Sequence, residues 1–393
     1  MSGMVRATAW AFVLCLVSIP ASAELPAGIF LDSEPRLEVN EIDHDGCPDC
    51  SQVRVHNPTS VPLTLSARID PLAPVPAEDR SLGGWIYSYA HELVTIDGDV
   101  QIAPEETDSR VQGFASRNRF ELRALTFSGQ AGEYRSGSYS VEIVLPEKSS
   151  VVLTAYAGKT IGENLTGSRV QDFLYWTLWS PLRALCLWVE YAISSLLPTL
   201  GALGVIALIV VVVRAITFPI NRWSFRSQKA FESVQKEIAP EIADIKKRLK
   251  GGDQSEAILE LYQSRGVNPL SGLKGSVGLF VQIPILIAMF NVASDSAILS
   301  GVPMGWVPDI AWPEHTASWG LDVPILGKFF NIIATGLAGF MIWSELTKNE
   351  RSIGSLTFAV AVGLLLYSFP AFLVVYWFLI TIAQYVEQKL ATR

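Results

Sequence analysis

A series of long apolar segments in the second half of the chain is the feature that most constrains its fold. They lie at about 200–220, 277–292, 325–344, 354–369 and 371–383. Inside a bilayer every backbone N–H and C=O group must be hydrogen-bonded within the protein, so segments of this kind form helices. The last two share one run that, as a single helix, would exceed a hydrocarbon core of about 30 Å, and we divide it at Pro370. The sequence thus predicts a multi-pass α-helical membrane protein with five spans.

The distribution of charge predicts the orientation of these spans. Loops rich in Lys and Arg stay on the cytoplasmic side of a membrane. Residues 220–274 contain 10 Lys and Arg against 7 Asp and Glu, whereas the loop 295–323 contains four acidic residues and no Lys or Arg. Five spans therefore place the basic loops and the C-terminus in the cytoplasm and the N-terminal part outside. Nucleic acid is not an expected partner, because no sustained basic face with interleaved aromatic residues occurs elsewhere.

The first residues have the organisation of a secretory signal peptide. Arg6 precedes an apolar core at about 7–17, and Ala21-Ser22-Ala23 is a small-residue cleavage signal. We predict a signal peptide at 1–23 that is cleaved after Ala23, with an uncleaved membrane anchor as the alternative. The region that follows is then exported into an oxidising compartment.

Residues 24–165 are predicted to form an exported all-β sandwich. Short strand-like segments alternate with clusters of Gly, Pro, Asn and Asp, at a spacing typical of such sandwiches. The expected strands lie at 36–40, 52–56, 63–69, 92–96, 120–127 and 136–145. The stretches HNPTSVPLTLSARI and GEYRSGSYSVEIVL resemble strands of exported immunoglobulin-like domains. That resemblance implies no functional residue.

Cys47 and Cys50 form the one local motif of this domain. They occur in HDGCPDCSQVRVH, with His44 and His56 on either side. An exported CxxC pair favours a disulfide within a turn. A redox-active pair is an alternative that lacks a surrounding thioredoxin-like βαβ pattern. A metal site is another, although its His and Cys spacing departs from ordinary zinc modules. The prediction is a disulfide, without a bound metal or cofactor.

The membrane core is predicted to occupy 170–393 and to begin with a helix in the membrane interface. Residues 176–196 combine several aromatic side chains with Arg183 and Glu190. Aromatic residues mixed with charge favour a helix that lies in the interface over one that crosses the bilayer.

The cytoplasmic region 221–266 predicts a helical hairpin. Its apolar repeat is formed by Ile238, Ile242, Ile245 and Leu249. Gly251-Gly252 then breaks the chain, and Asp253 with Glu256 starts a second helix. Pro240 predicts a break inside the first helix. The hairpin is either a solvated connection or a docking arm for a ribosome, a targeting factor or a nascent chain.

Arg214 is the residue of the spans that most needs an explanation. It lies inside the apolar stretch IALIVVVVRAITFPINR, about 5 Å to the cytoplasmic side of its centre. The side chain could face lipid and extend to the headgroups. A buried ion pair is not expected, because no predicted span contains Asp or Glu within its apolar core. Since an unpaired guanidinium at this depth is costly, the sequence favours a hydrated, positively charged cavity.

Several polar residues of the other spans could line such a cavity, and each could instead be hydrogen-bonded between helices. They are Gln282, Asn291, Asn331, Thr335, Ser368, Tyr376, Thr381 and Gln384.

Several segments of the predicted membrane core resemble a known family. The segments TLWSPLRALCLWVEYAI, VVRAITFPINRWSFRSQKA, IAPEIADIKKRL, LYQSRGVNPLSG, VQIPILIAMF and FPAFLVVYW are similar, in this order, to the YidC-type membrane protein insertases. The resemblance covers about residues 175–390. It implies that Arg214 lies in a client groove and that Tyr376 and Trp377 belong to a surface that contacts clients. It also implies a docking role for the hairpin, for which the candidate residues are Arg226, Lys229, Lys246, Lys247 and Arg248.

The function implied by the resemblance is a membrane protein insertase and chaperone of the bacterial inner membrane. Short polar client segments enter a hydrated groove from the cytoplasm, while the client's apolar helix passes into lipid. The implied partners are nascent membrane proteins and the bilayer, with a ribosome, a targeting factor or a Sec channel as further candidates. No nucleotide loop, metalloprotease helix or nucleophile elbow is present, so neither an enzyme nor a cofactor is expected.

The sequence departs from the family pattern at several positions, which leaves a second hypothesis open. Val210 lies one turn before Arg214, and Phe378 to Ile380 replace polar residues that are usual late in the last span. The exported part is also small for the family. The alternative is a membrane scaffold without insertase activity, whose exported β-domain binds an envelope partner. A small-solute transporter is disfavoured, since no inverted repeat is visible.

Overall fold

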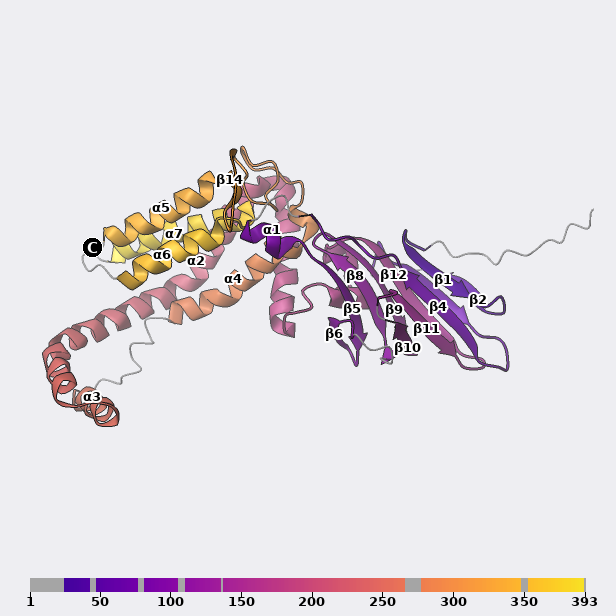
Figure 1. Ribbon diagram of the computed structural model, residues 1–393, viewed down its shortest axis with the longest axis horizontal. Coiled ribbons are helices and arrows are strands. Elements are labelled where there is room, and N and C mark those ends of the chain that lie inside the picture. The colour runs from indigo at the N-terminus through magenta and orange to yellow at the C-terminus, as the bar shows by residue number, and fades with distance from the viewer. Residues whose placement is uncertain are drawn as a thin grey trace, which may run out of the picture.

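The computed structural model describes residues 25–42, 47–76, 81–104, 110–135, 137–265, 277–347 and 353–391. Figure 1 shows a β-sandwich at one end of the long axis and a bundle of helices beside it, with a helical arm that projects at the far end. An all-β N-terminal region and a helical C-terminal region therefore match the predicted fold class. The predicted signal peptide, 1–23, lies outside the described residues.

Two antiparallel sheets form the sandwich. Within the described residues one sheet has the order β1-β4-β11-β10-β7 and the other the order β2-β3-β12-β9-β8-β5-β6. The bounds are β1 Ile29–Ser33, β2 Glu38–Ile42, β3 Ser51–His56, β4 Leu63–Ile69, β5 Ala90–Ile96, β6 Asp99–Ile102, β7 Arg110–Val111, β8 Gly113–Asn118, β9 Glu121–Ser128, β10 Gly132–Arg135, β11 Ser140–Leu145 and β12 Ser150–Lys159. A short helix, α1, spans Leu82–Tyr87 between β4 and β5.

Strand β8 is buried on both faces along its whole length. In β4 every second side chain is buried, so Leu65 and Ala67 point into the core between the sheets while the intervening residues face outward. In β8, by contrast, all residues are buried. One face of β8 contributes Phe114 to the core between the sheets, and the other face belongs to the contact with the helices. Alternation is therefore absent from β8, which was not among the predicted strands.

Short connecting segments join the sandwich to the helices. The 3₁₀ turns η1, Glu163–Leu165, and η2, Arg169–Phe173, follow β12 and lead into α2. Helix α2 spans Ser180–Arg248 and has one non-helical residue, Gly201, with φ 64° and ψ 173°. At Gly201 the chain turns, so the part that precedes it crosses the direction of the bundle and the part that follows runs along it (Figure 1). The first part corresponds to the helix that was predicted for the membrane interface.

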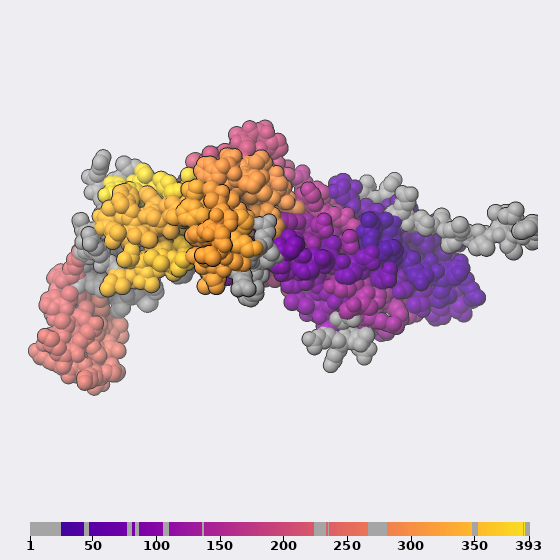
Figure 2. All heavy atoms as spheres, turned by 45° about the horizontal axis from the view of Figure 1, so that its top comes forward, coloured from indigo at the N-terminus to yellow at the C-terminus, as the bar shows by residue number. Residues whose placement is uncertain are grey.

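The remaining elements complete the bundle and its arm. They are α3 Gly252–Ser264, α4 Val277–Asp295, η4 Ala297–Leu299, β13 Ala317–Val323, β14 Gly327–Phe330, α5 Ile332–Leu346, α6 Ile353–Leu366 and α7 Ala371–Ala391. Helix α3 folds back beside the end of α2 and forms the predicted hairpin, which projects away from the bundle (Figure 2). The third predicted span was wrong at its start: residues 327–330 pair with β13, and the helix begins at Ile332.

The predicted break at Pro240 was also wrong. Helix α2 runs through Pro240, as it does through Pro219. A proline inside a helix removes one hydrogen bond and frees the carbonyl of the preceding turn. Pro240 is exposed and so are Glu237 and Glu241 beside it, which leaves that carbonyl open to water. The helix can therefore continue with a local irregularity instead of ending.

The helices differ in how well their lengths fit a membrane. Within the described ranges one helix, Ser180–Trp223, is long and apolar enough to cross a bilayer. The other apolar helical stretches, which are shorter, are Val281–Asp295, Ile332–Leu346, Ile353–Leu366 and Ala371–Glu387. At 1.5 Å per residue, the 15 residues of α5 rise about 22 Å. The predicted number of five spans therefore stays a prediction.

The turn at Gly201 gives a first test. Its combination of positive φ and extended ψ is essentially restricted to glycine. We expect Gly201→Ala to lower the free energy of unfolding by about 1–3 kcal/mol, the usual cost of such backbone strain. Gly339→Ala within α5 is the matched control, because a Cβ there would meet nothing within 4 Å. The measurement is unfolding in mixed detergent micelles; equal stability of the two variants would contradict the strained turn.

Candidate functional site

Arg214 lies in the part of α2 that runs along the bundle and is enclosed by protein. The residue is only 7% exposed, and its neighbours Val210 and Val213 are equally buried. Helix α2 packs against α4 and α7 on this side. The hypothesis in which Arg214 faces lipid is therefore wrong, because its side chain points into the contact between helices.

The guanidinium of Arg214 is held by helix α7. One terminal nitrogen, Nη2, donates a hydrogen bond to the main-chain carbonyl of Ile380. The other, Nη1, lies 3.5 Å from Oε2 of Glu387. Both partners lie on one face of α7, since seven residues correspond to about two helical turns. The charge of Arg214 thus links α2 to the second half of α7.

The expectation that Arg214 has no carboxylate partner was wrong. It rested on the apolar spans alone, and the last of these was taken to end near residue 383. Helix α7 continues to Ala391 and places Glu387 two turns beyond Ile380. A long helix at the edge of a membrane can carry its charge back toward the interior, because arginine and glutamate side chains are long and flexible. The guanidinium therefore has a carboxylate partner, and the predicted hydration of the cavity stays a prediction.

Two polar groups of this site have no partner among the residues that the structure describes. They are Nε of Arg214 and the hydroxyl of Tyr376, which lies one turn before Ile380 on α7 and is fully buried. Buried polar groups in proteins are nearly always hydrogen-bonded, so unsatisfied ones point to strain, water or a ligand. Here they mark a place where α2 and α7 could accept an additional polar group.

Three of the other predicted groove residues bond to their own helices. Asn291 donates to the carbonyl of Ile287 in α4. Thr335 and Thr381 donate to carbonyls four residues earlier, those of Asn331 and Trp377. Such hydrogen bonds satisfy the side chain without a partner from another helix. The structure therefore does not bring these residues to Arg214.

The remaining predicted residues are more varied in position. Asn331 is buried at the start of α5, where it donates to the carbonyl of Tyr367 and accepts from the backbone of His315. It thus fixes the loop before α5 and does not reach Arg214. Gln282 and Trp377 are both half-buried. Ile380 and Glu387, which hold Arg214, were not among the predicted residues.

The predicted docking residues of the hairpin that the structure describes are exposed to solvent. Lys246, Lys247 and Arg248 are exposed near the end of α2, where Arg248 pairs with Asp244. The side chains of Arg226 and Lys229 lie outside what the structure describes. Arg265, after α3, binds Glu237 and Glu241 of α2 and so closes the hairpin. The exposed basic end suits an anionic partner but identifies none.

Cys47 and Cys50 are joined by a disulfide. Cys47 is buried, and its sulfur contacts the carbonyl of Asn164 in η1. His44 lies outside the described residues. Within those that are described, no group of three or more His, Cys, Asp or Glu side chains could hold a metal ion. The disulfide therefore closes the turn between β2 and β3, and Asn164 donates a hydrogen bond from η1 to Asp49 in that turn.

Comparison with known proteins identifies the family. Residues 196–393, half of the chain, match the sequence profile of the family described as 60Kd inner membrane protein. The chain belongs to this family, which contains the YidC-type insertases. The match begins shortly before Gly201 and includes Arg214, the hairpin and the helices α4 to α7.

Named relatives agree with this assignment. The membrane protein insertase YidC of Chlamydia trachomatis serovar D is 28% identical over 212 residues, which make up 48% of this chain and 26% of that protein. The YidC of Clostridium perfringens is 29% identical over 224 residues, or 53% of this chain and 88% of that protein. The chain thus spans only about a quarter of the chlamydial relative.

A solved structure was also found. It is an active YidC insertase with its first transmembrane domain resolved, and it covers 92% of this chain and 79% of its own. The sequence identity is 15% and the TM-score 0.34.

The pair formed by Arg214 and Glu387 can be tested by a double-mutant cycle. We expect Arg214→Met and Glu387→Gln, alone and together, to reveal a coupling of about 1–3 kcal/mol, because a buried guanidinium loses a charged partner. Unfolding in mixed detergent micelles gives the four free energies. The pair of Arg248 and Asp244 is the control, since both side chains are more than half exposed and screened by solvent. A coupling no larger than that of the control would show that Arg214 and Glu387 do not interact.

Proposed function

We propose that this protein is a membrane protein insertase and chaperone of the inner membrane, with Arg214 as the residue that receives the client. The observation that carries the proposal is the enclosed guanidinium of Arg214, which is held by one carbonyl and one carboxylate and retains an unpaired Nε. Membership of the insertase family supports it. The proposed clients are nascent membrane proteins with short acidic or polar segments outside their apolar helices.

In the proposed topology, five spans cross the bilayer with the β-sandwich outside and the hairpin in the cytoplasm. The spans are the 201–220 part of α2 together with α4, α5, α6 and α7. The first part of α2 lies in the outer interface, where exposed Trp179, Trp188 and Tyr191 suit the headgroup region. A cleaved signal peptide at 1–23 would direct the sandwich outward.

The proposed mechanism is an exchange of carboxylates on Arg214. In the structure Glu387 neutralises the guanidinium, so the resting protein does not leave a bare charge among apolar helices. An acidic residue of a client that enters between α2 and α7 replaces Glu387, whose side chain then turns toward the cytoplasm. Because one ion pair replaces another, the exchange avoids most of the cost of burying a new charge. The client's apolar helix meanwhile passes into lipid.

Tyr376 supplies a second contact in this mechanism. Its hydroxyl, like Nε of Arg214, is buried without a partner among the described residues and can donate a hydrogen bond to a client carbonyl or carboxylate. Phe378 and Trp377 give the surrounding surface of α7 an apolar character that suits a client helix. The hairpin, with exposed Lys246, Lys247 and Arg248, is proposed to dock a ribosome, a targeting factor or a Sec channel.

Client insertion into proteoliposomes tests the role of Arg214. We expect Arg214→Glu to lower insertion of a client with an acidic external segment by roughly ten- to a hundredfold, since it removes a charge-assisted contact of the kind worth about 1.5–3 kcal/mol. Protease protection of the external segment is the measurement. Arg222→Ala is the control, because Arg222 lies on the same helix and is exposed.

The same assay separates this proposal from the scaffold hypothesis. If Arg214→Ala and Arg214→Glu leave the insertion of every tested client unchanged, while deletion of 24–170 abolishes the cellular phenotype, the insertase assignment fails. The exported domain would then carry the function.

The exchange of carboxylates makes a separate prediction for Glu387. We expect Glu387→Gln to lower the client concentration needed for half-maximal insertion by about three- to tenfold, because a competing carboxylate is removed. Glu237→Gln is the control, since its partner is Arg265 in the hairpin. A higher client requirement in Glu387→Gln would contradict the exchange and indicate that Glu387 itself assists the client.

A further inference from the structure

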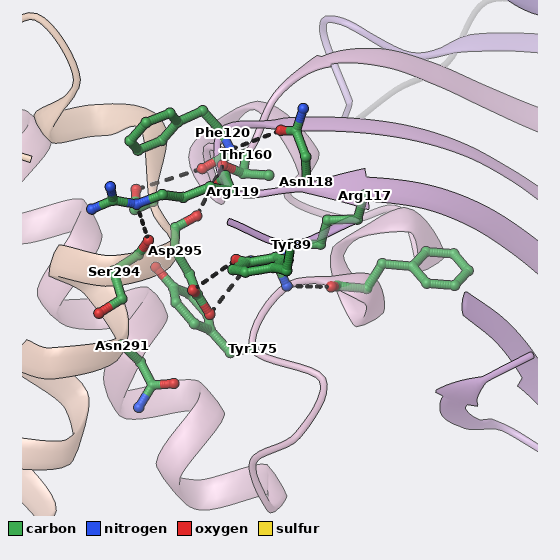
Figure 3. A network of polar contacts seen from close by, with 12 residues as sticks. Tyr89, Arg117, Asn118, Arg119, Phe120, Thr160, Tyr175, Asn291, Ser294 and Asp295 are labelled. Atoms are coloured by element: carbon green, nitrogen blue, oxygen red, sulfur yellow. Dashed lines mark hydrogen bonds and ion pairs between the residues drawn. The ribbon is translucent and has the colours of Figure 1, made fainter. Parts of the chain in front are cut away.

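Two arginines at the turn between β8 and β9 are buried where the sandwich meets the helices. Arg117 ends β8 together with Asn118, and Arg119 follows in the turn. Both arginines are almost completely buried, at 2% and 0% exposure. Figure 3 shows Arg119 extended from the sandwich toward the end of α4, with Ser294 and Asp295 beside it. A surface turn of a β-sandwich has thus become an interior part of the protein.

Arg119 binds the carboxyl end of α4. Its Nε donates to the carbonyl of Ser294 at 2.8 Å, and Nη2 donates to the carbonyl of Ala293 at 3.4 Å. The last carbonyls of a helix lack partners within the helix and carry the negative end of its dipole. A guanidinium satisfies both the hydrogen bonds and the charge. Arg119 is therefore a capping group for α4 that comes from another domain.

The same guanidinium also holds a loop, residues 310–312, that is hydrogen-bonded to the start of α7. Nη2 of Arg119 donates to the carbonyl of Ala311. The carbonyls on either side of it accept from the first amides of α7: Ile310 from Phe372 at 3.1 Å, and Trp312 from Ala371 at 2.8 Å. The loop 310–312 is thus fixed to α7 on one side and to Arg119 on the other. One residue of the sandwich connects the outer ends of α4 and α7.

Aromatic rings enclose this connection. The centre of the Arg119 guanidinium lies 4.3 Å from the ring of Tyr87, 4.6 Å from that of Phe120 and 4.4 Å from that of Trp312. Such contacts of a cation with ring faces strengthen when water is excluded. Burial raises the pKa of Tyr87 to about 12, so its hydroxyl remains neutral beside the arginine. Tyr87 also contacts Phe369, directly before α7, with ring centres 6.2 Å apart.

Asp295, the last residue of α4, is held by the sandwich as well. Tyr89 donates to Oδ1 of Asp295 at 2.9 Å, and Arg117 lies 3.6 Å from Oδ2. The hydroxyl of Thr160 at the end of β12 donates to the backbone carbonyl of Asp295 at 3.0 Å. Burial, with the nearby charge of Asp295, raises the pKa of Tyr89 and keeps its hydroxyl a donor. The sandwich therefore grips the end of α4 at several points around Arg119.

We propose that Arg119 is a positioning residue which fastens α4 to α7 at their outer ends and so keeps this end of the bundle closed. The proposal rests on the proposed function, in which a client reaches Arg214 between α2 and α7 from the cytoplasm. The helices must then separate near Arg214 without opening a path to the outside. Because Arg119 joins α4 to the cap of α7, the exported domain supplies that outer closure.

Accessibility of position 376 from each side of the membrane tests the closure. The full-length protein carries Tyr376→Cys and Cys15→Ser; Cys47 and Cys50 are already disulfide-bonded, and Cys186 is buried. In sealed proteoliposomes of one orientation, a membrane-impermeant maleimide is added on the outer or the inner side. With Arg119 intact we expect slow labelling from the outer side and faster labelling from the inner side. Equal labelling from both sides would overturn the proposal without the need for any Arg119 variant.

The second part of the labelling experiment uses substitutions of Arg119. We expect Arg119→Met to raise outer labelling about tenfold or more, in line with the loss of charged hydrogen bonds, and Arg119→Lys to restore part of the protection. Arg135→Met is the matched control, because Arg135 pairs with Glu142 within the sandwich and is largely exposed. Unchanged outer labelling in folded Arg119→Met would overturn the role of Arg119, as would failure of Arg119→Lys to protect better than Arg119→Met.

Client insertion, measured with Tyr376 intact, distinguishes this proposal from the proposed function. We expect Arg119→Met to reduce insertion while Arg135→Met does not. If Arg119→Met neither opens the outer side nor reduces client insertion, positioning by Arg119 is overturned and the insertase function stands. If Arg214→Glu inserts clients normally, the proposed function fails, and with it the positioning role of Arg119.

Discussion

A buried guanidinium needs acceptors for its charge, and this requirement organises the helical part of the protein. Arg214 and Arg119 are both enclosed, and both use main-chain carbonyls of helices or their adjoining loops as acceptors. Carbonyl groups are the strongest acceptors that an apolar helix can offer without an acidic side chain. Each arginine therefore determines which helices lie together: Arg214 brings α7 to α2, and Arg119 brings α7 to α4. Helix α7 is the element that both share.

Helix α7 consequently makes different kinds of contact at its start and in its later part. Its first residues, Ala371 and Phe372, are fixed by backbone hydrogen bonds to the loop 310–312. Its later part offers Ile380 and Glu387 to Arg214 through one carbonyl and one flexible side chain. The backbone contacts at the start are rigid, whereas the ion pair can exchange. A helix that is fixed at its first residues, and whose later part is held by an ion pair that can change partners, can tilt about its start. The proposed client entry requires such a tilt.

Sequence reasoning recognised the parts whose signal is local. Arg214 stands out because it interrupts an apolar run, and the disulfide follows from two cysteines three residues apart. Glu387 was missed because the helix was ended with its apolar stretch, although α7 continues for two more turns. Arg119 was missed for a different reason: in the sequence it is one arginine in a turn between strands. Arg119 is buried only because the turn packs against α4. The order of apolar and polar residues in the sequence does not predict a contact between segments so far apart.

The left-handed backbone at Gly201 also determines where the sandwich can lie. The φ and ψ angles of Gly201 fix the angle between the two parts of α2. They therefore also fix the direction in which the first part leaves the bundle. An L-residue with ordinary angles would send the first part of α2, and the sandwich attached to it, toward another side of the bundle. The contacts of Arg119 with the end of α4 depend on this direction. The achiral residue at position 201 thus selects which neighbours the β-sandwich can reach.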